Sequence, residues 1–210
     1  MMRGFILKDL YNMTSNFKQL LVVILSLLVM MGTFENMSAF SGMFIILLLG
    51  TLVVSSFSFD DMAKWDRYAI ALPVTRKQIV LSKYVVALIG LLTGTIVYFI
   101  ANIISLVIHG NLELGEMFLG SGIIVCVVVV MLSVMLPLVF KFGAEKSRII
   151  MMLVMVIPWL VTMIVMNMGI PVPSEAILSV IGYSLPVAVI ILLIGSYLIS
   201  VKIYEKKDLN

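Results

Sequence analysis

The chain has 210 residues, of which 62% are hydrophobic and only 12% are charged. Soluble domains average about 45–50% apolar and about 25% charged residues, so this composition excludes an ordinary soluble protein and indicates a membrane protein that crosses the bilayer several times. The net charge of +3 does not indicate nucleic-acid binding, because the Lys and Arg residues gather in a few connections between apolar stretches. The single cysteine, Cys126, excludes an intramolecular disulfide.

Residues 1–18 are too polar to cross a membrane. Apolar residues recur at helical spacing, while polar residues such as Lys8 and Asp9 fall elsewhere. This pattern predicts an amphipathic helix that lies on the cytosolic leaflet. The alternative is a secretory signal peptide with an apolar core at residues 20–31. Its removal would leave five spans and place the remaining positive loops opposite the start of the chain.

Six apolar stretches follow, and each predicts a transmembrane helix of about 20 residues. They cover residues 19–34, 40–59, 84–108, 117–140, 149–168 and 176–201. The last stretch is long and divides better into a short outer helix at 174–181, a turn, and a final span. That span would begin near Leu185, with Ser184 as its cap and Pro186 in its first turn.

The positive residues set the orientation of these spans. Lys and Arg occur before the first stretch, in the second and fourth connections and in the tail, whereas the other three connections contain none. Positive loops stay in the cytoplasm. The sequence therefore predicts an all-α protein of the cell membrane with six spans and both termini cytosolic. The cores of the spans lack Asp, Glu, Lys, Arg and His, which argues against ion-coupled carriers, intramembrane proteases and metal sites.

Two patterns inside the spans concern packing and cargo. Gly90-x-x-x-Gly94 would let a neighbouring helix approach closely. The fifth span carries large side chains at near-helical spacing, namely Met152, Met155, Trp159, Met163 and Met166. A Met-rich wall adapts to varied apolar partners, so a stripe that faces cargo is one interpretation. Met that faces lipid or packs against other helices is the alternative.

The connection at residues 60–83 is the longest polar segment. Asp60 and Asp61 suit the N-terminus of a helix, and Lys64 and Arg67 suit its later positions. This pattern predicts a short amphipathic helix that begins at these aspartates. Its apolar face would carry Met62, Trp65, Ala69 and Leu72, with Tyr68 beside it, and Pro73 would end it.

A second helix is predicted to begin directly after that turn and to continue into the third span. Thr75 and Gln78 form a capping box, with Val74 and Ile79 placed as its hydrophobic staple. Two interpretations of the whole loop stay open. It docks on a cytosolic partner, or it lies in the lipid interface with Trp65 and Tyr68 as anchors.

The amphipathic lead-in, the six spans and the helical loop after the second span resemble the permeases of the ABC-2 class of ATP-binding-cassette transporters. The stretch Asp61-x-x-x-Trp65-x-x-Tyr68-x-x-x-Leu72-Pro73-Val74-Thr75-Arg76-x-x-Ile79-Val80-x-x-Lys83-Tyr84 resembles the motif of small bacterial members, such as the staphylococcal exporter of phenol-soluble modulins. The resemblance implies a single transmembrane domain over 1–210, an elbow helix at 1–18 and a coupling loop at 60–75. The residues it implies in contact with a separate ATPase subunit are Asp60, Asp61, Lys64, Trp65, Arg67, Tyr68, Leu72, Pro73 and Arg76.

No Gly-x-x-x-x-Gly-Lys-Ser/Thr phosphate loop occurs in the sequence, so ATP and Mg would bind the partner ATPase and this chain would have no catalytic site. The expected partners are that ATPase, a second permease copy or paralogue, and the lipid bilayer. The leading hypothesis is the permease of an exporter for amphipathic peptides or other hydrophobic cargo. The alternative is a membrane anchor or sensor that recruits a cytosolic partner through residues 60–83 without transport.

Overall fold

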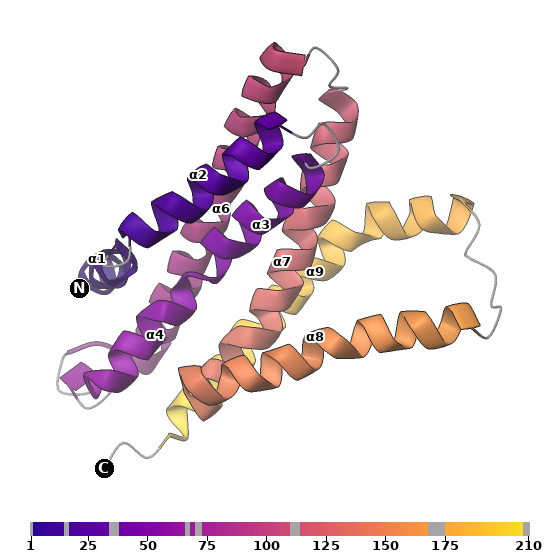
Figure 1. Ribbon diagram of the computed structural model, residues 1–210. Coiled ribbons are helices and arrows are strands. Elements are labelled where there is room, and N and C mark those ends of the chain that lie inside the picture. The colour runs from indigo at the N-terminus through magenta and orange to yellow at the C-terminus, as the bar shows by residue number, and fades with distance from the viewer. Residues whose placement is uncertain are drawn as a thin grey trace.

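The computed structural model describes residues 2–14, 17–33, 38–65, 68–69, 73–109, 114–167 and 175–207. Nearly all of these residues are helical, and no strand occurs among them (Figure 1). The all-α prediction is therefore confirmed. In chain order the helices are α1 (Met2–Thr14), α2 (Phe17–Thr33), α3 (Ser38–Thr51), α4 (Val53–Met62), α6 (Arg76–His109), α7 (Leu114–Phe142), α8 (Ala144–Asn167) and α9 (Glu175–Glu205).

Four segments of the described chain are long and apolar enough to cross a membrane: Ser41–Met62, Arg76–Ile104, Phe118–Phe142 and Ser184–Glu205. The first comprises most of α3 together with α4. Helices α1 and α2 meet at a bend of 67° and would provide a fifth span if the pair crosses as one. A multi-pass membrane protein is confirmed, and the count of six spans stays a prediction.

Helices α3 and α6 pack closely along their length because glycines remove side chains from the contact. A Cβ atom on Gly90 would lie 2.4 Å from the backbone oxygen of Leu49, and one on Gly94 would lie 3.0 Å from the Cα of Ile46. On α3, a Cβ atom on Gly42 would overlap the ring of Tyr98. The two glycines of the Gly-x-x-x-Gly pattern thus lie at the closest approach of the backbones.

Helix α9 lies against α7 and also contacts α6. The hydroxyl of Tyr84 on α6 shares hydrogen bonds with Ser196 at 2.6 Å and Ser200 at 2.8 Å, both on α9. At the C-terminal end of α9, the buried ring of Tyr204 packs edge-on against Phe140 of α7. These buried contacts fix α9 against the core near its C-terminal end.

The predicted division of the last stretch is wrong. Helix α9 is continuous from Glu175 to Glu205, with Ser184 and Pro186 inside it rather than at a new start. The backbone N–H and C=O groups of a membrane segment must be satisfied within the protein, which favours helix over a turn even beside Pro. Figure 1 shows the N-terminal part of α9 bending away from the bundle, and a Pro inside a helix is a common cause of such a bend.

Candidate functional site at the charged end of the helices

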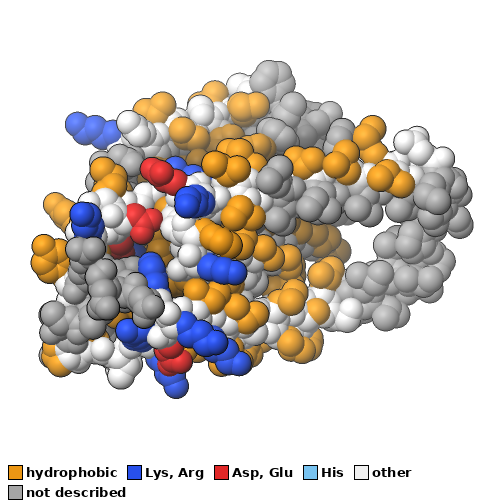
Figure 2. All heavy atoms as spheres, turned by 90° about the horizontal axis from the view of Figure 1, so that it is seen from below, with side chains coloured by type: hydrophobic (Ala, Val, Ile, Leu, Met, Phe, Trp, Pro, Cys, Tyr) orange, Lys and Arg blue, Asp and Glu red, His pale blue; other side chains and the backbone are white. Residues whose placement is uncertain are grey.

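Four segments far apart in the sequence meet at one end of the molecule. They are α1, the connection between α4 and α6, the start of α8 and the end of α9. Figure 2 shows Lys and Arg gathered with Asp and Glu toward one end of the face it draws, with hydrophobic side chains over much of the rest. The segments that the sequence assigned to one side of the membrane are thus joined in the fold.

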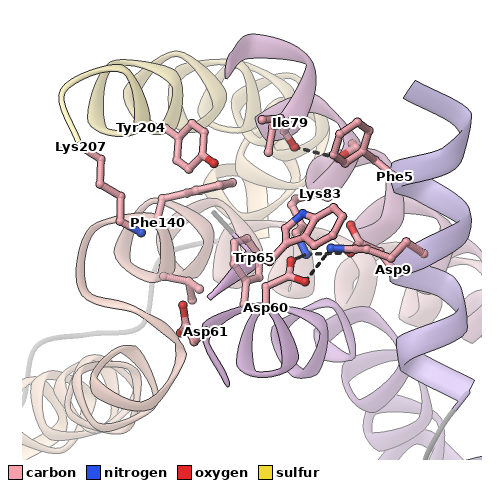
Figure 3. A pocket seen from close by; sticks show the side chains of 14 residues that line it. Phe5, Asp9, Asp60, Asp61, Trp65, Ile79, Lys83, Phe140, Tyr204 and Lys207 are labelled. Carbon is pink, nitrogen blue, oxygen red and sulfur yellow. Dashed lines mark hydrogen bonds and ion pairs between the residues drawn. The ribbon is translucent and has the colours of Figure 1, made fainter. Parts of the chain in front are cut away.

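Buried ion pairs form the centre of this end, and we call Lys8, Asp9, Ser56, Asp60 and Lys83 the charged cluster. Figure 3 shows Asp9, Asp60 and Lys83 of this cluster close together. The Nζ atom of Lys83 lies 2.6 Å from Asp60 Oδ2, 2.9 Å from Asp9 Oδ1 and 2.8 Å from Ser56 Oγ. Lys83 is 4% exposed and Asp9 is 1% exposed. Charges this deeply buried persist only when they are paired and hydrogen-bonded, as these are.

Lys8 completes the charged cluster from its outer side. Its Nζ atom lies 2.6 Å from Asp60 Oδ1 and 3.2 Å from Asp9 Oδ1. It also lies 4.3 Å from the centre of the Trp65 ring, a cation–π contact, and that ring packs edge-on against Phe5 of α1. Two lysines and two aspartates balance in charge, so the cluster joins α1, α4 and α6 without a net buried charge.

The cavity beside the charged cluster is too small to hold a substrate. Its volume is about 20 Å³, and its wall includes Trp65, Ile79, Phe140 and Tyr204 (Figure 3). A water molecule needs roughly 10–15 Å³ measured in this way, so the cavity has room for about one. Among the described residues, no group of His, Cys, Asp and Glu is placed to hold a metal ion.

The prediction that Asp60 and Asp61 begin a helix is wrong, because both lie in the last turn of α4. Each is instead positioned by a distant segment. Asp60 is paired within the charged cluster, and Asp61 Oδ2 accepts a hydrogen bond of 3.0 Å from the backbone N–H of Ala144. Asp61 therefore satisfies the N-terminus of another helix, α8. Gly143 has a φ of +81° at this junction, a conformation that favours glycine.

The sequence predicted that the apolar residues between α4 and α6 share one face. The described residues of this set do not, because some are exposed and others are buried. Met62 is 82% exposed and Tyr68 is 65% exposed, whereas Ala69 is fully buried and Trp65 is half-buried against α1. Lys64 is exposed and has a φ of +50°, so the backbone turns there rather than continuing as a helix. Arg67 and Leu72 lie outside the described residues. The exposed surface of this loop is thus centred on Met62 and Tyr68.

The start of α6 follows the sequence prediction. Helix α6 begins at Arg76, the N–H of Gln78 donates to Thr75 Oγ1, and the N–H of Thr75 donates to Gln78 Oε1. The capping box is confirmed. Arg76 has a role that the sequence did not reveal, because its Nη1 donates to the carbonyl oxygens of Tyr204 and Lys207 at the end of α9. A cation suits this end of a helix, where the last carbonyls lack helical partners.

The predicted cargo stripe on α8 is described only in part. Met152 and Met163 are exposed, and the side chains of Met155, Trp159 and Met166 lie outside the described part of the structure. In Figure 1, α8 starts beside the end of α7 and then diverges from the bundle. Exposed apolar side chains on such a helix suit contact with lipid, with cargo or with a second permease.

The charged cluster itself was not predicted. Sequence reasoning placed Asp9 on the polar side of the lead-in helix, but Asp9 lies on its buried side together with Phe5 and Met13. The signal was present in the spacing, because residues 5, 9 and 13 are each four apart and share one helix face. An acidic residue in the middle of an apolar face predicts a buried cationic partner. The sequence did not reveal which lysine that partner would be.

The fold and the site together define the class of this protein. It is a multi-pass α-helical membrane protein whose charged groups gather at one end. Within that class, the chain belongs to the ABC-2 transporter family: the family model described as "ABC-2 family transporter protein" matches residues 4–205. Comparison with curated proteins and with solved structures gives no significant match. The family supports a permease subunit of an ABC transporter that works with an ABC ATPase in a membrane and is not itself catalytic.

Proposed function

We propose that this chain is the permease of an ATP-driven exporter in which a separate ATPase docks on the charged end. The observation that carries the proposal is the connection between the exposed loop and the spans. Trp65, three residues before the exposed Tyr68, touches Lys8, which is paired with Asp60, and Asp60 is paired with Lys83 near the start of α6. A push on the loop would thus reach α1, α4 and α6 through direct contacts.

The orientation and stoichiometry belong to the same proposal. Because positive loops stay in the cytoplasm, the Lys and Arg residues at this end support a cytosolic position for this end and for both termini, with the protein in the plasma membrane. Two permeases, identical or paralogous, would work with two ATPase subunits. Apolar spans without ionisable groups in their centres suit amphipathic peptides first, and other hydrophobic molecules second.

The decisive experiment separates transport from anchoring. The permease is purified from its native membrane, and proteins that accompany it are examined for an ATPase with a phosphate loop. The pair is then placed in proteoliposomes with a fluorescent amphipathic peptide. We expect peptide movement that needs ATP and stops with a non-hydrolysable analogue. A stable complex with a cytosolic protein, but no movement of any peptide or lipophilic dye, would favour the anchor or sensor instead.

A further inference from the structure

Two exposed apolar side chains lie beside the contact that joins α4 to α8. Met62, which follows Asp61, is 82% exposed, and Phe142, which precedes Gly143, is 42% exposed. The hydrogen bond from the Ala144 N–H to Asp61 holds these two chain segments next to each other. Neither Met62 nor Phe142 belongs to the hydrophobic core of the described residues. Both side chains can therefore contact a molecule outside the chain.

The junction between α7 and α8 is short and fixed. A single residue, Gly143, separates the end of α7 at Phe142 from the start of α8 at Ala144. Its φ of +81° turns the chain, and a Cβ atom added there would lie 3.2 Å from Asp61 Oδ2. Because so short a connection has little freedom, a force on the junction would act on both helices. A force on the exposed loop after α4 would reach the same junction through Asp61.

Charged side chains flank the two apolar ones in the sequence. The exposed charged residues are Asp61, Lys64, Lys141, Glu145 and Lys146. The carboxylate of Asp61 is bonded to the N-terminus of α8, so a partner would meet three lysines and the carboxylate of Glu145. An apolar centre with a mainly positive border is complementary to an apolar recess that has acidic residues at its edge.

The position of the junction favours a protein partner over the bilayer. Met62 and Phe142 are the last residues of the segments Ser41–Met62 and Phe118–Phe142, so both lie where those candidate spans end. The charged side chains near each residue favour water at this end of the helices. The exposed Tyr68 continues the surface from Met62 beyond the end of the span. A cytosolic protein could cover these side chains from that side, whereas acyl chains lie on the other side of the boundary.

We propose that the junction of α7 and α8 makes a second contact with the ATPase, beside the exposed loop that contains Met62 and Tyr68. Phe142 would fill an apolar recess of the ATPase, and Lys141 and Lys146 would face acidic residues at its edge. The contact rests on the proposed function and enlarges the docking surface, which sequence reasoning confined to residues 60–83. One ATPase subunit would then act on the ends of α4, α7 and α8 together.

Photocrosslinking tests the contact in the complete complex. Benzoylphenylalanine replaces Phe142, Tyr68 or Leu119 in the full-length permease, which is expressed together with the ATPase that accompanies it. Position 68 reports the loop contact of the proposed function. Leu119, 72% exposed near the other end of α7, is the control. We expect ATPase adducts from positions 142 and 68 and none from position 119.

The pattern of adducts separates this contact from the proposed function as a whole. Adducts from position 68 without adducts from position 142 would overturn the second contact and leave the proposed function in place. Adducts of position 142 with lipid alone would overturn it too, and would assign the junction to the bilayer. No ATPase adduct from either position would contradict both the second contact and docking through the loop.

Binding measurements test the chemistry of the surface. Phe142→Ala should weaken ATPase binding to the purified permease about tenfold, as loss of an apolar anchor in an interface does, and Leu119→Ala should leave it unchanged. Lys141→Gln with Lys146→Gln should slow association at low salt, whereas Glu145→Gln should not. Thermal unfolding of each variant checks that the fold is retained. Wild-type binding by Phe142→Ala, or equal slowing by the lysine and glutamate changes, would overturn the proposal.

Discussion

The carboxylate of Asp61, near the end of α4, accepts a 3.0 Å hydrogen bond from the backbone N–H of Ala144, the first residue of α8. The end of α4 thereby fixes the start of α8. The exposed loop follows Asp61 directly, so movement of that loop would also act on the entry of α8. This second connection complements the one that runs through the charged cluster.

The Asp61 contact predicts how the stabilities of two variants should rank against wild type. Asp61→Ala removes the acceptor and should lower the free energy of unfolding by about 1 kcal/mol, as loss of a helix N-cap does. Asp61→Asn keeps an acceptor oxygen and should stay close to wild type. Thermal unfolding in detergent measures both, and hydrogen exchange at the start of α8 localises the effect. Equal losses for the two variants would show that the negative charge matters rather than the cap.

Removal of Lys83 should destabilise the protein far more. Lys83→Met leaves Asp9 and Asp60 buried with one partner fewer, and loss of one member of a buried ion pair typically costs about 3–5 kcal/mol. Lys77→Met, an exposed position on the same helix, is the control and should be close to neutral. Adding Asp9→Asn to Lys83→Met should recover part of the loss because it removes the unpaired charge. No recovery would mean that the lysine acts mainly through packing.

The contact between α3 and α6 predicts that Gly90 does not tolerate a methyl group. In Gly90→Ala the new Cβ would lie 2.4 Å from the carbonyl oxygen of Leu49, which is backbone and cannot turn aside. The helices must separate, at a cost of about 1–3 kcal/mol. The matched control is Gly120→Ala on α7, where no atom lies within 4 Å of the added Cβ. Thermal unfolding of the two variants tests this, and similar midpoints would contradict it.

Substitutions at Tyr68 and at Trp65 should distinguish an effect on ATPase binding from an effect on the stability of the fold. Tyr68 is 65% exposed, so Tyr68→Ala should change stability by no more than about 0.5 kcal/mol while weakening ATPase association and transport. Trp65 packs on Phe5 and Lys8, so Trp65→Ala should destabilise the protein by about 1 kcal/mol or more.

Pull-down of the ATPase and thermal unfolding, measured on the same preparations, distinguish these effects. If the Tyr68→Ala protein bound the ATPase and transported cargo as well as wild type, the loop would not be part of the docking surface.

Six spans predict a pattern of cysteine labelling in a Cys126→Ala background. Asn111→Cys and Ser174→Cys, in connections without Lys or Arg, should react with an impermeant thiol reagent on intact cells. Lys77→Cys and Lys146→Cys, both exposed at the charged end, should react only after lysis. Labelling of Lys146→Cys from outside would place the start of α8 on the outer face and contradict the six-span orientation.

The sequence by itself determined the features that depend on neighbouring residues. Apolar stretches of sufficient length predicted membrane helices, and the capping box at Thr75 and Gln78 predicted the start of α6 correctly. Such features depend on spacings of a few residues along one helix, where local geometry is fixed. The division proposed near Ser184 failed because local turn preferences are overridden where the backbone must satisfy its own hydrogen bonds in a membrane.

Only the tertiary structure decided which partners the charged and aromatic side chains have. Asp9 meets Lys83 across 74 positions of sequence, Asp61 meets Ala144 across 83, and Arg76 meets Tyr204 across 128. The resemblance to ABC-2 permeases implied that the carboxylates and Trp65 contact an ATPase, and it did not reveal their partners within the chain. Asp60, Asp61 and Trp65 each have such a partner in the fold. A charge brought into a helix bundle must be paired there, and the packing of distant helices selects the pair.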